Sequence, residues 1–382
     1  MANENDLIVT LQSLDPTILT RVVRLDQHSP NFAIGDLSVR RLSDRGIINP
    51  DGLWLFSGQG RDERGERPWS VVLKILNLPE GGGTDEDGYE LLVARSGLTE
   101  RLPGPVKAQR FYETQKRPEA AWIWMEHVQP KSSDPWRLED YAFTARQIGR
   151  WNGAFLNGKA LPREPWLKRQ QYRIWINRDN NAEAYNFPLN QKYITGTTRA
   201  RQERLWAERE QFFRVLESLP QVFSHFDLQR RNLFIRTGQD GRDELVAVDW
   251  AWCGIDSVGA ELYSLVGGSV TLLEWPVSAL PELDAVTFSN YLEGLREAGW
   301  LGEAELARLG YTAWLAVWWG CVFPIAFTFW ASEGFRSYAL QQFGVAGEAM
   351  YEKWMPWLEA ILDYADEARQ LASKLGMKIT SL

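Results

Sequence analysis

The sequence predicts an α+β protein with a small, sheet-rich N-terminal lobe and a larger, mostly helical C-terminal lobe. Between residues 37 and 76, short apolar runs alternate with turn residues, a pattern typical of strands joined by tight turns. After Val128 a linker rich in Pro, Ser and Asp follows (QPKSSDPW), and beyond it apolar residues recur at helical spacing. We therefore expect two domains, residues 1–128, with a lead-in over 1–35, and residues 129–382.

The N-terminal elements follow in order from local patterns. A glycine spacer precedes the predicted helix. The residues after it form the cap, because Thr and Asp favour the N-cap and acidic residues favour the first turn of a helix. A charged connection, QGRDERGERP, is expected between the second and third strands. We expect strands over 36–43, 53–58 and 69–76, a turn at 49–52, the glycine spacer at 81–83, the cap at 84–87, a helix through 89–98, and strands near 105–113 and 120–128.

The C-terminal lobe is helical in period, with one exception. Apolar residues at three-to-four spacing predict helices over 141–156, 199–219 and 351–375. Residues 233–249 instead contain two short apolar runs around the turn Gly238-Gln239-Asp240-Gly241, which predicts a β-hairpin.

Composition excludes several classes of protein. Of the 382 residues, 45% are hydrophobic and 24% charged, the balance of a globular domain rather than of a disordered or collagenous chain. The net charge of −8 argues against a nucleic-acid partner. Two cysteines, Cys253 and Cys321, cannot form a disulfide framework, and the first residues lack a signal-peptide pattern, so we expect a cytoplasmic protein.

One uncharged segment is long enough to cross a membrane. From Leu309 to Ser332 no residue is charged. However, its tryptophans are spread through the segment rather than gathered at two interfaces, and Gly320 and Pro324 interrupt it. We expect a buried core helix and no membrane span.

The stretch SHFDLQRRNLFIR contains the residues with the clearest chemistry. Asn232 lies five residues after Asp227 and enters one strand of the predicted hairpin, and Asp249 ends the other. The hairpin therefore places Asn232 and Asp249 side by side, where an amide and a carboxylate offer oxygen ligands to a hard cation such as Mg²⁺. Asp227, on the preceding loop, faces whatever the cation holds. This is the set of groups that phosphoryl transfer needs.

A lysine on a half-buried strand adds to this set. In WSVVLKIL, Lys74 shares a face with Val72, while Val71 and Leu73 face the other way. A lone lysine there needs a partner, and Glu90 on the following helix is well spaced to supply it, with Glu86 and Glu100 as close rivals.

The order H-x-D-x-x-x-x-N, followed about seventeen residues later by an apolar-Asp pair, resembles the aminoglycoside phosphotransferase and choline kinase superfamily, a branch of the protein-kinase-like fold. The resemblance implies that Asp227 is the catalytic base and that His225 is a buried orienting residue. It implies that Asn232 and Asp249 bind magnesium. The stretch after Asp249 also resembles the family, although Glu261 stands where an aspartate is usual.

The same resemblance extends to the N-terminal lobe. It implies that Lys74 and Glu90 grip the α- and β-phosphates of ATP. It also implies that the backbone of MEHV, over Glu126, His127 and Val128, hydrogen-bonds the adenine. The expected cofactors are ATP and Mg²⁺, and the expected partner is a small molecule with a hydroxyl acceptor.

The acceptor itself stays open. The negative net charge suits a polycationic aminoglycoside, whereas the aromatic residues over 311–354 suit a choline-like ammonium through cation–π contact. Gln229, two residues after Asp227, resembles choline kinases. Sugar and amino-acid kinases of the superfamily are further alternatives.

Two other classes of function are weighed against this one. A non-catalytic pseudokinase is disfavoured by the intact set of Lys, Asp, Asn and Asp. A protein kinase is disfavoured because residues 43–52 lack the G-x-G-x-x-G loop and no A-P-E segment is present. The triple glycine at 81–83 lacks the G-x-x-x-x-G-K-S/T pattern, which favours a spacer over a phosphate loop.

Overall fold

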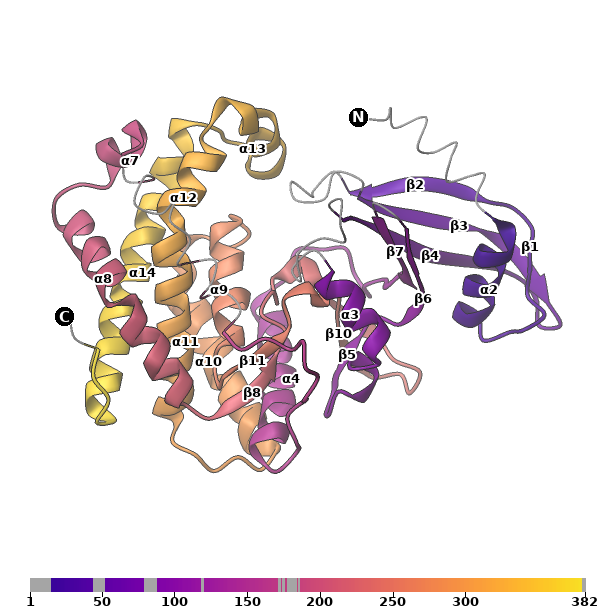
Figure 1. The fold of residues 1–382 in the computed structure, drawn as a ribbon, viewed down its shortest axis with the longest axis horizontal. Coiled ribbons are helices and arrows are strands. Elements are labelled where there is room, and N and C mark those ends of the chain that lie inside the picture. Colours follow the sequence, from indigo (N-terminus) through magenta and orange to yellow (C-terminus); the bar gives the residue numbers. More distant parts are fainter. Residues whose placement is uncertain are drawn as a thin grey trace. The chain divides into compact units, whose positions relative to one another are not determined.

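The computed structural model confirms the predicted fold class, with a sheet-rich N-terminal lobe and a helical C-terminal lobe (Figure 1). The chain divides into two compact units. The first comprises Met1–Leu102, Lys107–Lys131 and Val246–Ala251, and the second comprises Pro103–Val106, Ser132–Leu245 and Trp252–Leu382. The residues described are 15–43, 52–78, 88–117, 120–170, 173, 176, 184 and 186–379.

The first unit is built on an antiparallel sheet in the order β1-β3-β4-β7-β6, with β2 also paired to β3. Among the described residues, two α-helices accompany it. Its elements are α2 (Pro16–Asp26), β1 (Ala33–Ile34), β2 (Ser38–Ser43), β3 (Leu53–Asp62), β4 (Gly65–Asn77), α3 (Tyr89–Ser96), β6 (Phe111–Lys116) and β7 (Ala120–Glu126).

Each face of this sheet packs against its own apolar cluster. Val71, Leu73 and Ile75 of β4 belong to a buried cluster that also contains Val22 and Val23 of α2. Val72 belongs to a second cluster, which includes Leu91 of α3 and Ile123 of β7. The alternation predicted for β4 is therefore confirmed, and it places Lys74 on the same side as α3.

The charged connection expected over residues 59–68 is wrong, because these residues belong to strands. β3 and β4 pair without interruption as far as Asp62 opposite Gly65. Charged side chains pair across the hairpin: Arg67 donates to both carboxylate oxygens of Asp62, at 2.5 and 2.7 Å. Asp62 also accepts hydrogen bonds from Arg64. Paired charges of this kind do not interrupt a strand as solvated charges would.

Several expected features lie outside the described residues. They are the start of the lead-in before Asp15, most of the turn at 49–52, the glycine spacer at 81–83 and the cap at 84–87. The helix expected after this cap is present as α3, and it ends at Gly97, whose φ of 64° suits glycine at a helix C-terminus.

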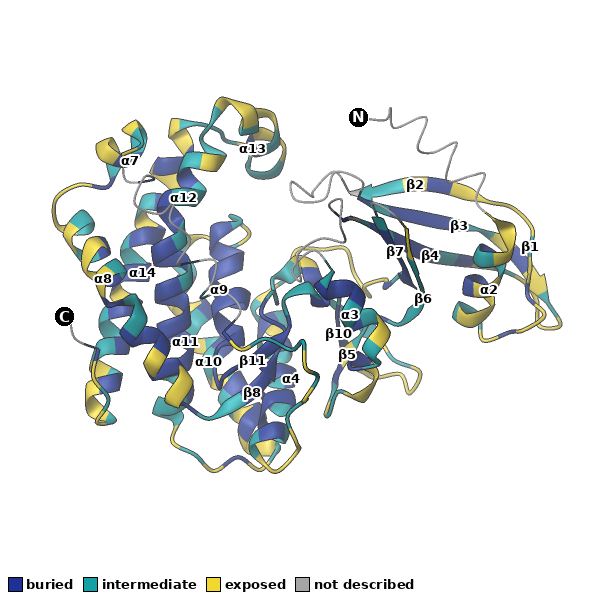
Figure 2. Ribbon diagram, in the orientation of Figure 1, coloured by how far each residue is buried: buried dark blue, intermediate teal, exposed yellow. Residues whose placement is uncertain are grey.

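The second unit is mostly helical, and buried residues dominate its inner helices (Figure 2). Helices α8, α11 and α14 run side by side (Figure 1). The helices are α4 (Leu138–Leu156), α7 (Pro188–Tyr193), α8 (Gly196–Ser218), α9 (Glu261–Thr271), α10 (Leu280–Glu297), α11 (Ala304–Leu315), α12 (Cys321–Trp330), α13 (Arg336–Phe343) and α14 (Glu348–Lys374). The three helices predicted from periodicity correspond to α4, α8 and α14.

The predicted hairpin is confirmed as β9 (Leu233–Thr237) and β10 (Asp243–Ala247), closed by a bond from the Gly238 N–H to the Arg242 carbonyl at 2.7 Å. β5 (Val106–Ala108) pairs with β10, so the predicted strand at 105–113 is two shorter strands. A second pair, β8 (Gln221–Ser224) with β11 (Gly254–Ser257), is not foreseen by the sequence analysis.

The uncharged segment forms α11, a π-helical turn over Ala316–Gly320, and α12. Within the described chain, Ala304–Trp330 is the one helical run long and apolar enough to cross a membrane, and 72% of its most apolar window is buried. Trp314, Trp319 and Phe323 lie in the interior. This burial agrees with the expected core helix.

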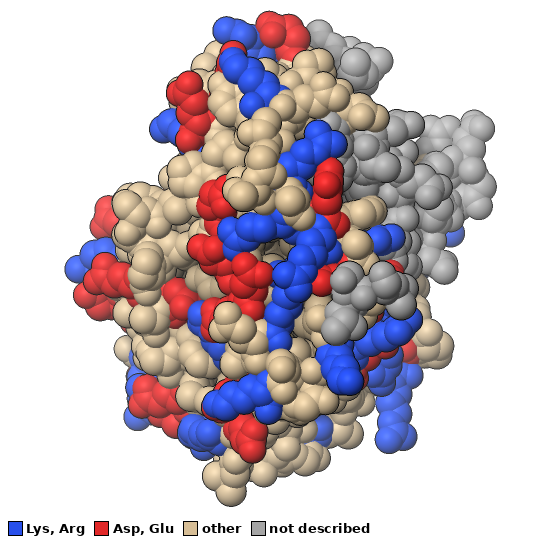
Figure 3. All heavy atoms as spheres, turned by 90° about the vertical axis from the view of Figure 1, so that its left-hand side faces the viewer, with Lys and Arg blue, Asp and Glu red and all other residues tan. Residues whose placement is uncertain are grey.

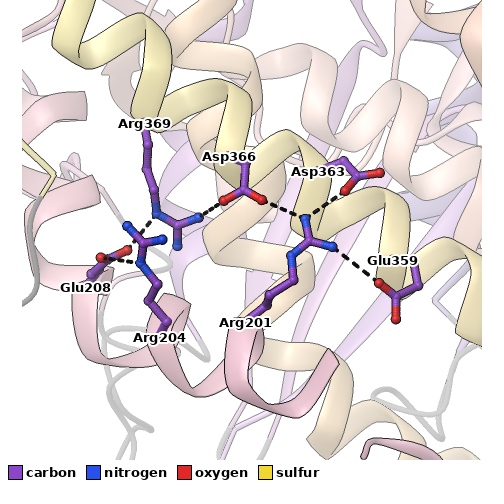
Figure 4. A network of polar contacts seen from close by, with 7 residues as sticks. All are labelled: Arg201, Arg204, Glu208, Glu359, Asp363, Asp366 and Arg369. Atoms are coloured by element: carbon purple, nitrogen blue, oxygen red, sulfur yellow. Dashed lines mark hydrogen bonds and ion pairs between the residues drawn. The ribbon is translucent and has the colours of Figure 1, made fainter. Parts of the chain in front are cut away.

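Acidic and basic side chains are interspersed on the face that carries α8 and α14 (Figure 3). Ion pairs join the two helices there (Figure 4). Arg201 of α8 pairs with three acids of α14, and the buried Glu208 of α8 pairs with Arg204 and Arg369; the three acids are Glu359, Asp363 and Asp366.

Candidate functional site

Lys74 lies between two carboxylates in the first unit. Its Nζ is 2.5 Å from Glu90 Oε2 and 2.8 Å from Asp249 Oδ1. β4 presents the lysine, α3 presents Glu90, and Asp249 follows β10 in the short segment that returns to this unit. The predicted partner is therefore confirmed as Glu90. Its rival Glu100 is exposed in a 3₁₀ turn, and Glu86 lies outside the described residues.

Burial and charge act together on this triad. Burial raises the pKa of Glu90 to about 7, against the opposing effect of the Lys74 ammonium. Burial by itself would lower the pKa of Lys74, but the two carboxylates outweigh it and raise the lysine pKa. Lys74 therefore carries a positive charge that two acids hold in one position, where it suits a phosphate ligand.

Asp249 has a strained backbone. Its φ is 66°, in the left-handed region that residues other than glycine rarely adopt. The segment after it forms a 3₁₀ turn, Trp250–Trp252, in which the buried Trp250 donates from Nε1 to the Ala247 carbonyl at 3.0 Å. Strain of this kind persists only where the surroundings enforce it, and it often accompanies function.

The loop after β8 carries the second group of predicted residues, in the second unit. The Asp227 carboxylate accepts a hydrogen bond at each oxygen, from Gln229 Nε2 to Oδ1 and from Asn232 Nδ2 to Oδ2, both at 2.7 Å. His225 is buried, and its Nδ1 accepts the Asp227 backbone N–H at 3.2 Å. The loop thus brings together His225, Asp227, Gln229 and Asn232, all of which the sequence analysis selected.

Asn232 is oriented so that its amide oxygen is available to a ligand. Both hydrogen bonds from Nδ2 go to Asp227, one to the backbone carbonyl at 2.8 Å and one to the carboxylate. The amide group is therefore turned with its donors toward Asp227. In the described chain, no side chain or backbone group donates to its Oδ1.

Glu261 supports this loop, a role that the sequence did not reveal. Its carboxylate, fully buried on α9, accepts the backbone N–H groups of His225 and Phe226. Phe226 has a φ of 69° and its carbonyl accepts from Tyr263 Oη at 2.6 Å. Burial raises the pKa of Glu261 to about 8, and the two N–H donors oppose this rise. The only signal in the sequence was the acid at position 261 itself.

The segment after β7 contains the other predicted nucleotide contacts. Glu126 ends the strand, pairs with Val71, and its Oε2 accepts the Arg110 backbone N–H at 3.1 Å. His127 Nδ1 lies 2.9 Å from Ser70 Oγ, and burial lowers the pKa of His127. Val128 is buried. Since sheet pairing ends at Glu126, the backbone of 127 and 128 lies beyond the strand.

A hollow of about 730 Å³ opens beside this segment within the first unit. It is lined from β3 and β4 by Leu55, Ser57 and Ser70, and from the end of β7 and the segment after it by Glu126, His127 and Gln129. Its walls combine apolar and hydrogen-bonding groups, which is typical of small-molecule sites.

The predicted residues thus form two groups, one in each unit. The first unit unites Lys74, Glu90 and Asp249 and contains residues 126–128. The second unites the loop residues around Asp227 and Asn232. The hairpin β9–β10 connects the groups along the chain, because Asn232 directly precedes β9 and Asp249 lies two residues after β10.

Comparison with known proteins identifies the family. The model of the phosphotransferase enzyme family matches residues 67–305, so the chain belongs to this family. This confirms the family predicted from the H-x-D-x-x-x-x-N motif, and membership supports a small-molecule phosphotransferase. No curated protein sequence matches the chain.

Two solved structures are similar to this chain. An amicoumacin kinase in complex with AMP-PNP, Ca²⁺ and Ami is 14% identical, with a TM-score of 0.51 over 93% of this chain and 95% of that one. A choline kinase from Cryptosporidium parvum Iowa II is 14% identical, with a TM-score of 0.49 over 95% and 97% of the two chains. The first likeness confirms a kinase-like fold.

Proposed function

We propose that this protein transfers the γ-phosphate of ATP, with Mg²⁺, to a hydroxyl group of a small molecule. The observation that carries the proposal is the position of Lys74, held by Glu90 at 2.5 Å and by Asp249 at 2.8 Å. A buried ammonium fixed by two acids is costly to maintain for stability alone. Beside a triphosphate, it supplies charge where charge develops during transfer.

The side chains fit a magnesium ion. Asn232 offers an amide oxygen, because its Nδ2 is committed to Asp227, and Asp249 offers a carboxylate. The described residues contain no group of three or more His, Cys, Asp and Glu suited to a metal. Magnesium commonly takes only one or two protein oxygens together with substrate phosphates, and each of these residues supplies an oxygen of the kind it prefers. When bound, the ion would neutralise the triphosphate.

The adenine site is proposed in the hollow of the first unit. The backbone of 127 and 128 lies beyond the paired part of β7 and is suited to hydrogen bonds with a purine edge. Leu55 supplies an apolar wall. This assignment follows the resemblance of the segment MEHV to the adenine-binding segment of the family. We therefore propose that Glu126, His127 and Val128 contact the adenine.

Asp227 is the proposed base. Its carboxylate is oriented by a donor on each oxygen, and it lies on the loop that precedes the proposed metal ligand Asn232. It would accept or orient the proton of the acceptor hydroxyl, a contribution of about 10²- to 10⁴-fold. No covalent enzyme intermediate is needed.

The low charge of residues 309–347, the segment before α14, favours an acceptor with few positive charges. Residues 309–347 contain one acid, Glu333, and one base, Arg336. Aromatic side chains in this segment are partly accessible: Phe329 is 43% exposed, and its ring centroid lies 3.7 Å from that of Phe335. A polycationic aminoglycoside would need more carboxylates, whereas a monocationic amino alcohol suits aromatic walls through cation–π contact. Amino alcohols are therefore our first choice of acceptor.

The test is ADP release by the purified protein with Mg-ATP against separate pools of amino alcohols, aminoglycosides, sugars and hydroxy amino acids. We expect release with one pool, and none with Asp249→Asn, which weakens both the lysine contact and the metal ligand. Phosphopeptide formation from a peptide pool would instead support a protein kinase. ATP binding with no release from any pool would favour the pseudokinase.

A further inference from the structure

The side chain of Gln229 donates a hydrogen bond to the carboxylate of Asp227, two residues earlier in the chain. Gln229 Nε2 donates to Asp227 Oδ1 at 2.7 Å, while Asn232 occupies Oδ2 at the same distance. Each oxygen therefore has its own neutral donor. Since two such bonds define the plane of a carboxylate, rotation of the Asp227 side chain is restricted on both sides.

The orientation of the Gln229 amide is set by this contact. A carboxylate only accepts hydrogen bonds, so the NH₂ group and not the oxygen must face Asp227. As a result, Gln229 Oε1 is buried with no hydrogen-bond partner among the described residues. A buried oxygen without a partner reduces stability. Among the described residues, the hydrogen bond that its side-chain amide makes is the one to Asp227.

A glycine in helix α9, Gly268, leaves space for the side chain of Gln229. A Cβ atom on Gly268 would lie 2.9 Å from Gln229 Cγ, too close without displacement, and 3.5 Å from Cβ and Cδ, an ordinary contact. Gly268 lies within the continuous helix α9, three residues before its end at Thr271. The glycine therefore gives Gln229 the space in which its amide reaches Asp227.

We propose that Gln229 is a positioning residue for the base Asp227, and that Gly268 is required for it. The proposal rests on the proposed phosphotransfer. Gln229 acts through Asp227: it holds the carboxylate in the plane from which one oxygen can accept the hydroxyl proton. Without it, Oδ1 loses the hydrogen bond that Gln229 supplies, and the carboxylate presents the proton-accepting oxygen in only part of its orientations.

The decisive variant is Gln229→Met, which preserves length and removes both polar atoms. We expect kcat to fall about 10- to 100-fold, with KM for ATP within about twofold of the wild type, because no nucleotide contact changes. Thermal stability should stay equal or rise, because the unpaired Oε1 is removed. Gln370→Met, on the exposed face of α14, is the matched control and should change neither quantity.

A double-mutant cycle tests the link to Gly268. Gly268→Ala should displace the glutamine and lower kcat, whereas the same substitution added to Gln229→Ala should cost little more, because the clash is gone. Additive losses would show that Gly268 acts independently of Gln229. An unchanged kcat in Gln229→Met, or equal losses of kcat and stability, would overturn the positioning role.

A measurement without turnover keeps this inference separate from the proposed function. The side-chain amide signal of Gln229 in ¹⁵N NMR should shift when Asp227 is replaced by Ala, whether or not the wild type transfers phosphate. An unchanged signal would disprove the contact itself. If the signal shifts but the wild type releases no ADP with any acceptor, the proposed function fails and the positioning role fails with it.

Discussion

The carboxylate of Glu261 accepts a hydrogen bond from the backbone N–H of Phe226 at 3.2 Å. Phe226 has a φ of 69°, and the adjacent His225 N–H binds the other oxygen of the same carboxylate. The strained turn that precedes Asp227 is thus anchored to α9 by one buried side chain.

We expect Glu261→Gln to disturb the catalytic loop. An amide accepts only through its oxygen, so one of the two backbone N–H groups loses its partner and meets an NH₂ group instead, at a cost of about 1–3 kcal/mol of unfolding free energy. Turnover should fall, since Asp227 follows the anchored turn. Chemical denaturation and ADP release measure the two effects. An unchanged midpoint and rate would contradict the anchoring role.

The pH dependence of stability should report the buried acids of the second unit. Burial raises the pKa of Glu261 to about 8 and that of Asp256 to about 7, from ordinary values of 4.5 and 3.8. The folded state therefore binds more protons than the unfolded state between about pH 4 and pH 8. Consequently, stability is highest below pH 4 as far as these groups are concerned, and it falls as the pH rises to 8.

Urea titrations at pH 5 and pH 8 measure this decline. The variant Glu261→Gln, which cannot ionise, should show a smaller difference between the two pH values than the wild type. Asp256→Asn should act in the same direction, because Trp314 and Ser257 donate to its Oδ1, which an amide oxygen can replace. Equal slopes in the wild type and both variants would exclude these acids as the cause.

Lys74→Met should impair the use of ATP. It removes the ammonium that lies between Glu90 and Asp249, and removal of one fixed electrostatic group costs about 10²- to 10³-fold in rate. Glu90→Gln should be milder, since Lys74 keeps Asp249 as a partner. Steady-state kinetics with varied Mg-ATP test both variants. Equal kcat/KM in the wild type and Lys74→Met would remove the lysine from the proposed nucleotide site.

Asp227→Ala should fold normally and lose turnover. The donors to its carboxylate, Gln229 and Asn232, belong to the same loop after β8, so we expect the fold to tolerate the substitution. The expected loss is about 10²- to 10⁴-fold. Circular dichroism controls for the fold, and ADP release measures the rate. Turnover close to the wild-type rate would exclude Asp227 as the base.

The ion pairs between α8 and α14 should differ in their effect on stability. The Glu208 side chain is completely buried and pairs with Arg369, whereas the Asp363 side chain is 75% exposed (Figure 4). Glu208→Leu leaves the mostly buried Arg369 without this partner and should cost about 3 kcal/mol. Asp363→Asn should cost less than about 1 kcal/mol. Similar losses in both variants, measured by urea denaturation, would contradict this ranking.

Local patterns were sufficient for much of the fold and for the residues of the candidate site. Strand alternation around Lys74 placed the lysine on the correct face, and the turn at 238–241 predicted the hairpin β9–β10. Glu90 was chosen over its rivals by its spacing along one helix. These properties depend on neighbours within a few residues, so a single sequence displays them.

Contacts between distant segments were decided only by the tertiary structure. The sequence does not show that β8 pairs with β11, nor that the charged residues 59–68 continue two strands. It also does not show that Glu261 anchors a loop 35 residues earlier. Whether a charge is solvated, paired or buried depends on the free energy of packing the whole chain. Sequence by itself therefore determined which groups are present and their local spacing, while packing decided which of them meet.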